Sequence, residues 1–126
     1  NDIKKFIQRV ELNKKKCLNF LKKCQINKKK VFIYGASTKG NTLLQYYGIN
    51  TGMINFASER SPEKWGKYTI GTGLKIISEA KARKLNPHYF FVMPYGFIKE
   101  FIKREKPWLK KGGKFILPYP GFKILR

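Results

Sequence analysis

Acidic residues, histidine and cysteine are all scarce in this chain of 126 residues. Only seven residues are Asp or Glu, against 28 Lys and Arg, and His88 is the one histidine. The two cysteines, Cys17 and Cys24, are too few for a structural zinc site. Their seven-residue spacing, about two helical turns, instead predicts two core-facing side chains in a reduced, cytoplasmic protein. No apolar run approaches the roughly 20 residues that a membrane span needs, so we expect no membrane partner.

Catalytic machinery is sparse as well. There is no Ser–His–acid set, no metal-ligand cluster and no obvious catalytic pair of carboxylates, so we expect a binding domain with no catalytic residues of its own. The size fits a single domain, and 42% hydrophobic and 15% aromatic residues are enough for a real core. The first residues, Asn-Asp-Ile-Lys, contain neither an initiator Met nor a secretion signal, and we therefore expect the C-terminal fragment of a longer protein.

The excess of positive charge is the most unusual feature of the composition. A net charge of +21 favours nucleic acid, anionic lipid or a phosphorylated small molecule as a partner. However, only five of the 28 cations are arginines, the residues that bind phosphates and bases bidentately. This bias favours a solvated lysine surface over a dedicated polyanion-binding face. A nucleic-acid-binding or self-association module without a catalytic role remains the alternative function.

The hydrophobic pattern alternates between strand-like apolar runs and helical periods, which is typical of an α/β fold with a mostly parallel sheet. Residues 3–25 show the spacing of a long amphipathic helix, whose apolar stripe needs a partner surface. Expected strands cover residues 31–34, 53–57, 89–93 and 114–117, with an edge at 122–125; expected helices follow at 42–47, 78–85 and 97–106. We therefore predict an N-terminal helix and connector (1–30) and a Rossmann-like, three-layer domain of four to five strands (31–126).

The strand at 31–34 runs directly into a glycine turn and a helix. A dinucleotide-binding G-x-G-x-x-G motif is excluded because residue 37 is serine. The NTPase phosphate loop fails because its lysine is displaced to Lys39, with Asn41 in the required position. Two interpretations stay open: a helix N-terminus that holds an anion, or a turn whose glycines only permit close packing.

In an open α/β sheet, ligands bind beyond the carboxyl ends of the strands. Segments 34–41, 59–72 and 94–96 all follow strands and should meet there. Glu59 could bind ribose hydroxyls or simply pair with Arg60 or Lys64. His88 precedes its strand, at the opposite edge, and is expected to be a surface loop residue.

Two of these segments resemble a known family. The run Tyr34-Gly-Ala-Ser-Thr-Lys-Gly-Asn-Thr-Leu-Leu44 resembles the Y-G-A-x-x-K-G-N-T-L-L signature of the C-terminal domain of sugar C-methyltransferases. Residues 59–72 are similar to that family's D-x-N-P-x-K-x-G-x-Y-x-P-G-T segment, with Glu59 for Asp, Ser61 for Asn and Ile70 for Pro. Pro94-Tyr95-Gly96 stands where the family usually has Pro-Trp-Asn. The resemblance covers about residues 3–125.

The resemblance implies a Rossmann-like domain that helps hold a nucleoside-diphosphate sugar for an S-adenosylmethionine-dependent methyltransferase of deoxysugar or bacterial polysaccharide biosynthesis. It places the catalytic residues, S-adenosylmethionine and zinc in preceding domains of the same chain, and no cofactor in this one. The substrate-binding residues that it implies are Tyr34, Gly35, Ala36, Ser37, Thr38, Lys39, Gly40, Asn41, Glu59, Arg60, Lys64, Tyr68, Thr72, Pro94 and Tyr95.

Overall fold

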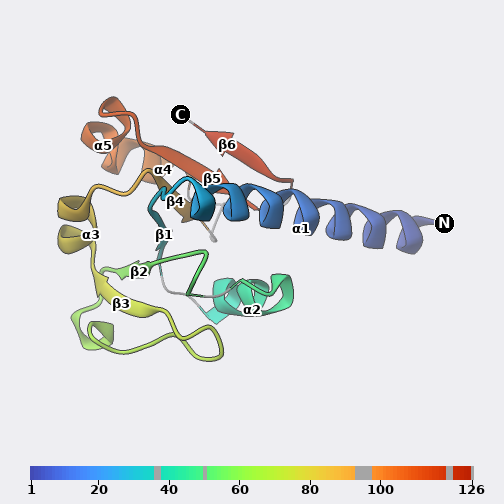
Figure 1. The fold of residues 1–126 in the computed structure, drawn as a ribbon, viewed down its shortest axis with the longest axis horizontal. Coiled ribbons are helices and arrows are strands. Elements are labelled where there is room, and N and C mark those ends of the chain that lie inside the picture. Colours follow the sequence, from blue (N-terminus) through green and yellow to red (C-terminus); the bar gives the residue numbers. More distant parts are fainter. Residues whose placement is uncertain (36–37, 50, 93–97, 119–120, 126) are drawn as a thin grey trace.

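A computed structural model describes residues 1–35, 38–49, 51–92, 98–118 and 121–125, with the backbone alone for 38–42. Its centre is a six-stranded sheet in the order β3-β2-β1-β4-β5-β6 (Figure 1). The strands are β1 (Val31–Tyr34), β2 (Phe56–Glu59), β3 (Lys75–Ser78), β4 (Tyr89–Val92), β5 (Lys114–Leu117) and β6 (Lys123–Leu125). The helices are α1 (Asp2–Ile26), α2 (Thr38–Tyr47), the short 3-10 helix η1 (Pro62–Lys64), α3 (Glu79–Leu85), α4 (Ile98–Arg104) and α5 (Lys106–Lys110).

The expected α/β class, the mostly parallel sheet and the long N-terminal helix are confirmed. Strands β1 to β5 are parallel, and β6 pairs antiparallel with β5. All four residues of β1 are buried, as a central parallel strand requires. The sheet has six strands, more than the four to five expected.

The sheet separates two hydrophobic clusters. Because side chains alternate along a strand, Val31 and Ile33 of β1 join one cluster, and Phe32 and Tyr34 join the other. The first cluster includes residues of α1 and α2, and the second includes residues of α3, α4 and α5. Helices therefore cover both faces, which makes three layers.

Helix α1 has two different halves. In its C-terminal half, Cys17, Leu21 and Cys24 are buried against the sheet, as the cysteine spacing predicted. Toward the N-terminus the same apolar stripe is uncovered, with Ile3 and Phe6 72% and 53% exposed. Figure 1 shows this half projecting well past the sheet. This domain thus covers only half of the predicted stripe.

Three local predictions need correction. The strand expected at 53–57 is β2, which begins only at Phe56, because residues 51–53 form a turn. Strand β3 was missed because its four residues run straight into α3, whose N-cap is Ser78. The helix expected at 97–106 is two helices, because α5 carries a proline in its first turn that cannot continue α4.

The long connection from β2 to β3 folds back along the sheet edge. Gly66 donates its N–H to the carbonyl of Ile76 (2.9 Å), and Ile76 donates to Lys67 (2.8 Å). Tyr68 forms an isolated antiparallel bridge with Lys75. This segment covers β3, which is otherwise the exposed edge of the sheet. Among the described residues, no helix is long and apolar enough to cross a membrane.

Candidate functional site

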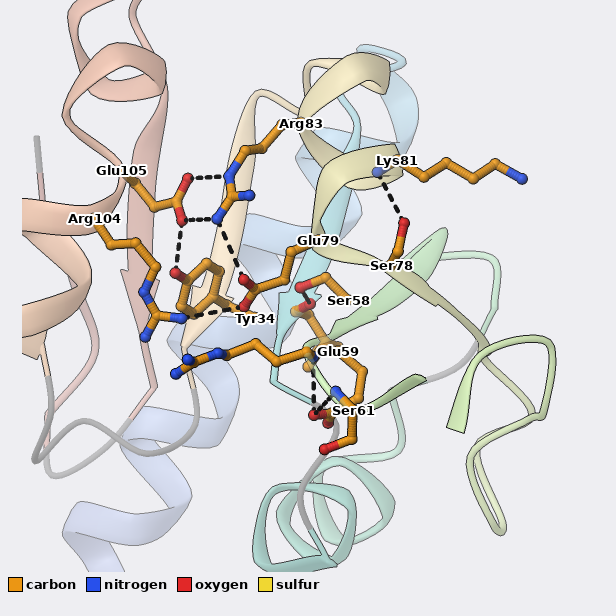
Figure 2. Close-up of polar contacts among 12 residues, drawn as sticks. Tyr34, Ser58, Glu59, Ser61, Ser78, Glu79, Lys81, Arg83, Arg104 and Glu105 are labelled. Carbon is orange, nitrogen blue, oxygen red and sulfur yellow. Dashed lines mark hydrogen bonds and ion pairs between the residues drawn. The ribbon is translucent and has the colours of Figure 1, made fainter. Parts of the chain in front are cut away.

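A pocket of about 290 Å³ lies where β1, β2 and β3 end, which we call the carboxyl-edge pocket. Tyr34 and Glu59 are the last residues of their strands, Glu79 follows β3 directly, and α4 supplies the far side. Figure 2 shows Tyr34, Glu59, Glu79 and Arg104 converging from these elements. The pocket is lined by Tyr34, Gly35, Glu59, Arg60, Glu79, Glu100, Phe101 and Arg104.

A partly buried ion pair lies next to this pocket. Glu105, only 1% exposed, accepts hydrogen bonds from Arg83 Nε at 2.9 Å and Arg83 Nη2 at 2.7 Å. The Tyr34 hydroxyl donates to the same carboxylate at 2.7 Å. One carboxylate therefore ties β1, α3 and the junction of α4 and α5 together (Figure 2).

The pair extends into the pocket through Glu79. Its two oxygens accept from Arg83 Nη2 at 3.3 Å and Arg104 Nη1 at 3.4 Å. The Arg104 guanidinium also lies over two aromatic rings, 5.7 Å from the centre of Tyr34 and 5.3 Å from that of Phe101. These contacts hold the guanidinium in place at the pocket wall.

Titration behaviour follows from this network. Burial alone would raise the pKa of Glu105, but the hydrogen bonds from Arg83 and Tyr34 outweigh it and hold the pKa below its ordinary value. Burial, and then the hydrogen bond to Glu105, raises the pKa of Tyr34 well above its usual range. At neutral pH the carboxylate is charged and the phenol is neutral, so Tyr34 acts as the donor.

Glu59 closes the turn that leaves β2. Its Oε1 accepts from the backbone N–H groups of Arg60 (3.0 Å) and Ser61 (3.2 Å), and Lys64 Nζ lies 3.8 Å from Oε2. Next to it, Gly35 has φ +88° and donates its N–H to the Ser58 carbonyl at 3.1 Å. This left-handed conformation favours glycine where β1 turns away from the sheet.

The structure brings some of the predicted site residues together and separates others. Tyr34, Gly35, Glu59 and Arg60 line the carboxyl-edge pocket, and Lys64 contacts Glu59 beside it.

Tyr68 and Thr72 lie elsewhere, on the segment along β3. The first is 62% exposed, whereas the second is 7% exposed and hydrogen-bonds Thr69. The backbone of Thr38, Lys39, Gly40 and Asn41 begins α2, whereas Ala36, Ser37, Pro94 and Tyr95 lie outside the described residues.

Four lining residues were missed from the sequence: Glu79, Glu100, Phe101 and Arg104. They come from the helices that follow β3 and β4, and only the packing of those helices brings them to the first two strands. The one clue in the sequence is the scarcity of acids, which singles out each acid but not where the acids meet. Three of the chain's seven acidic residues line this one pocket, in a protein with four times as many cations as acids.

Two other features are less suited to be the site. A larger hollow of about 640 Å³ lies along α1, but side chains of that one helix line it, and no strand end contributes. Across the described residues, no group of three or more His, Cys, Asp or Glu side chains could hold a metal ion. His88 is exposed, and its Nδ1 accepts from the Lys30 N–H at 2.9 Å, a structural contact at the opposite edge.

The fold and the pocket define an α/β domain with a candidate ligand site at the carboxyl edge of a mostly parallel sheet. The chain belongs to the C-methyltransferase C-terminal domain family, whose model matches residues 1–120. The C-methyltransferase NovU of Streptomyces niveus is 35% identical to it over 92 residues. That match covers 73% of this chain but only 22% of NovU, so the chain spans about a fifth of this relative's length. The family is one of transferases.

Proposed function

We propose that this chain is the substrate-binding domain of an S-adenosylmethionine-dependent C-methyltransferase that acts on a nucleotide-linked sugar. The observation that carries the proposal is the position of the carboxyl-edge pocket in a domain of this family. The pocket lies at the strand ends where α/β sheets bind ligands, and four of the residues implied by the family resemblance line it.

The strand order supports a Rossmann-like fold. From the central strand β1, the chain first adds β2 and β3 on one side of the sheet and then adds β4 and β5 on the other side. The direction in which strands are added therefore reverses between β1 and β4. Nucleotide-binding sheets place their ligands at this reversal. Residues of α4, the next described helix after β4, and the end of β1 both line the pocket, which fits such a role.

The methyl donor would be held outside the carboxyl-edge pocket. S-adenosylmethionine combines a nucleoside with an amino acid, and 290 Å³ is at the lower limit for a drug-sized ligand. Methyl transfer would therefore take place in other domains, and this domain would position the acceptor. A cytoplasmic location would follow from such a substrate.

Calorimetric titration of the chain with UDP-glucose and dTDP-glucose tests this function. We expect saturable binding of at least one nucleotide sugar, weakened by Arg60→Ala because Arg60 is the most exposed cation at the pocket. Lys84→Ala, on the outer face of α3, is a control that should leave binding unchanged. Absence of binding at millimolar ligand, both for the chain and for any longer protein that contains it, would contradict the proposal.

A further inference from the structure

The lining of the carboxyl-edge pocket is much richer in carboxylates than the whole chain. The protein has 28 cations and seven acids, yet the pocket is lined by three carboxylates and two guanidinium groups. A diphosphate placed there would face Glu59, Glu79 and Glu100 at short range, and like charges in a partly enclosed site repel strongly. A lining with more carboxylates than guanidinium groups is poorly suited to a phosphate.

Carboxylates are, however, good acceptors for hydroxyl groups. Glu100 is exposed on the first turn of α4 and, among the described residues, has no hydrogen bond or ion pair. Glu59 and Glu79 are fixed by backbone N–H groups and by arginines, respectively. The pocket thus offers one unoccupied acceptor and two that are already oriented.

Arg104 supplies the complementary donors. A guanidinium has five N–H groups, and within the described structure the one contact of Arg104 to an acceptor is with Glu79 at 3.4 Å. The rings of Tyr34 and Phe101, over which it lies, help to hold the guanidinium in place and add an apolar surface to the pocket. Fixed donors, carboxylate acceptors and an aromatic wall suit a ring that carries several hydroxyl groups.

We propose that the carboxyl-edge pocket binds one hydroxyl-bearing ring, either the sugar or the ribose of a nucleotide sugar, and that the diphosphate lies outside it. A volume of 290 Å³ suits a single ring. This inference rests on the proposed function and identifies which part of the ligand the pocket takes. Arg83 and Glu105 are positioning residues, because they hold Glu79 and Tyr34 without lining the pocket.

A ring in the pocket and a diphosphate in the pocket predict opposite changes in affinity when negative charge is removed from the lining. For a bound ring, Glu100→Gln loses a charged acceptor, and we expect UDP-glucose to bind about three- to tenfold more weakly, with a larger loss for Glu100→Lys. For a bound diphosphate, both substitutions remove repulsion and tighten binding. Glu63→Lys is the matched control, since it makes the same charge change on η1 at a residue that does not line the pocket.

Calorimetry with UDP-glucose, dTDP-glucose, UDP and pyrophosphate completes the test. If the ribose occupies the pocket, the effect of Glu100→Gln shrinks with dTDP-glucose, which lacks the 2′-hydroxyl. If the hexose occupies it, the effect is equal for both sugars and disappears with UDP. Equal or tighter binding of the nucleotide sugars by Glu100→Gln, or tighter binding of pyrophosphate by that variant, overturns the inference. An unmodified chain that binds no nucleotide sugar contradicts the proposed function instead. Circular dichroism confirms that each variant is folded.

Discussion

Glu105 shows how much one residue contributes in a chain with so few acids. It lies at the junction of α4 and α5, completely buried, and it binds Arg83 and Tyr34 together. The sequence pattern placed this position near the end of a single surface helix, with nothing to mark it as buried. Its role depends on Arg83, 22 residues away, and on Tyr34, 71 residues away.

Replacement of Glu105 should destabilise the fold. Glu105→Gln removes the charge that faces Arg83, and we expect a loss of about 2 kcal/mol in the free energy of unfolding. The loss is smaller than for a fully buried pair, because the Arg83 side chain is 39% exposed and can regain water. Urea denaturation at pH 7 measures it. Glu63→Gln, which removes an exposed acid, should cost less than about 0.5 kcal/mol, and a similar cost for both variants would contradict the assigned role.

The same residue should make stability depend on pH. Its folded pKa is lowered, so its contribution is complete above the unfolded value of about 4.3 and is lost as the pH falls through the folded pKa. Partial desolvation, together with the charges of Lys29 and Lys30, lowers the pKa of His88, and protonation of this residue therefore destabilises the fold below about pH 6.5 in any variant. The gap in stability between the wild type and Glu105→Gln should therefore stay constant from pH 7 to pH 5 and narrow below pH 4. A gap that is unchanged at pH 3 would contradict this account.

At the scale of elements, α1 carries one apolar stripe in two environments. The C-terminal half packs on the sheet, and the N-terminal half extends past it with its apolar side chains exposed. Helical periodicity identifies such a stripe but not what covers it, because covering depends on where the sheet ends. For the same reason the sequence predicted the helix correctly but did not predict that its N-terminal half is exposed.

Two substitutions in α1 should differ sharply in how much they lower the free energy of unfolding. Leu21 is fully buried, and Leu21→Ala should cost about 2–4 kcal/mol through lost packing and a residual cavity. Ile7 lies on the same stripe but is 54% exposed, so Ile7→Ala should cost less than about 0.5 kcal/mol. Urea denaturation compares the two directly. Equal losses would mean that the outer half is covered in solution.

Gly113 allows the chain to pass close to the buried Trp108 of α5. A Cβ at this position would overlap the indole of Trp108, which is buried and donates its Nε1–H to the Pro87 carbonyl at 2.9 Å. Gly113→Ala should therefore destabilise the protein by about 1–3 kcal/mol and alter the tryptophan fluorescence. Gly121→Ala, where a Cβ meets nothing within 4 Å, is the control.

Fold prediction from the sequence succeeded where apolar residues form a continuous run. It failed where the structure depends on contacts between residues far apart in the sequence. The continuous apolar run 31–34 identified the central strand because a strand buried on both faces excludes polar residues. Strand β3 could not be separated from α3 by pattern, since Lys75-Ile-Ile-Ser ends in the helix cap itself. Within the pocket, Glu59 and Arg60 followed from strand topology. Arg104 could not, because it reaches the pocket only through the packing of α4 on the sheet.

Across the whole molecule, the net charge of +21 has a measurable consequence of its own. We expect weak, sequence-independent binding to duplex DNA that falls about 10²–10³-fold between 50 and 200 mM salt, as counterion release requires. Fluorescence anisotropy with a 30-base-pair duplex measures it. Substitution of single surface lysines should reduce the affinity gradually. Affinity that barely changes over this range would contradict this electrostatic account.

The two edges of the sheet also determine how this molecule can associate with others. One edge is covered by the chain's own segment beside β3, and the other is the three-residue antiparallel strand β6. Free strand edges are templates for the pairing of further strands, and here one is occupied and the other is short. Growth of the sheet from copy to copy is therefore disfavoured, as it is by the repulsion between two molecules of charge +21. Concentrated solutions of this protein should therefore remain free of fibrils, although the N-terminal half of α1 exposes apolar side chains to water.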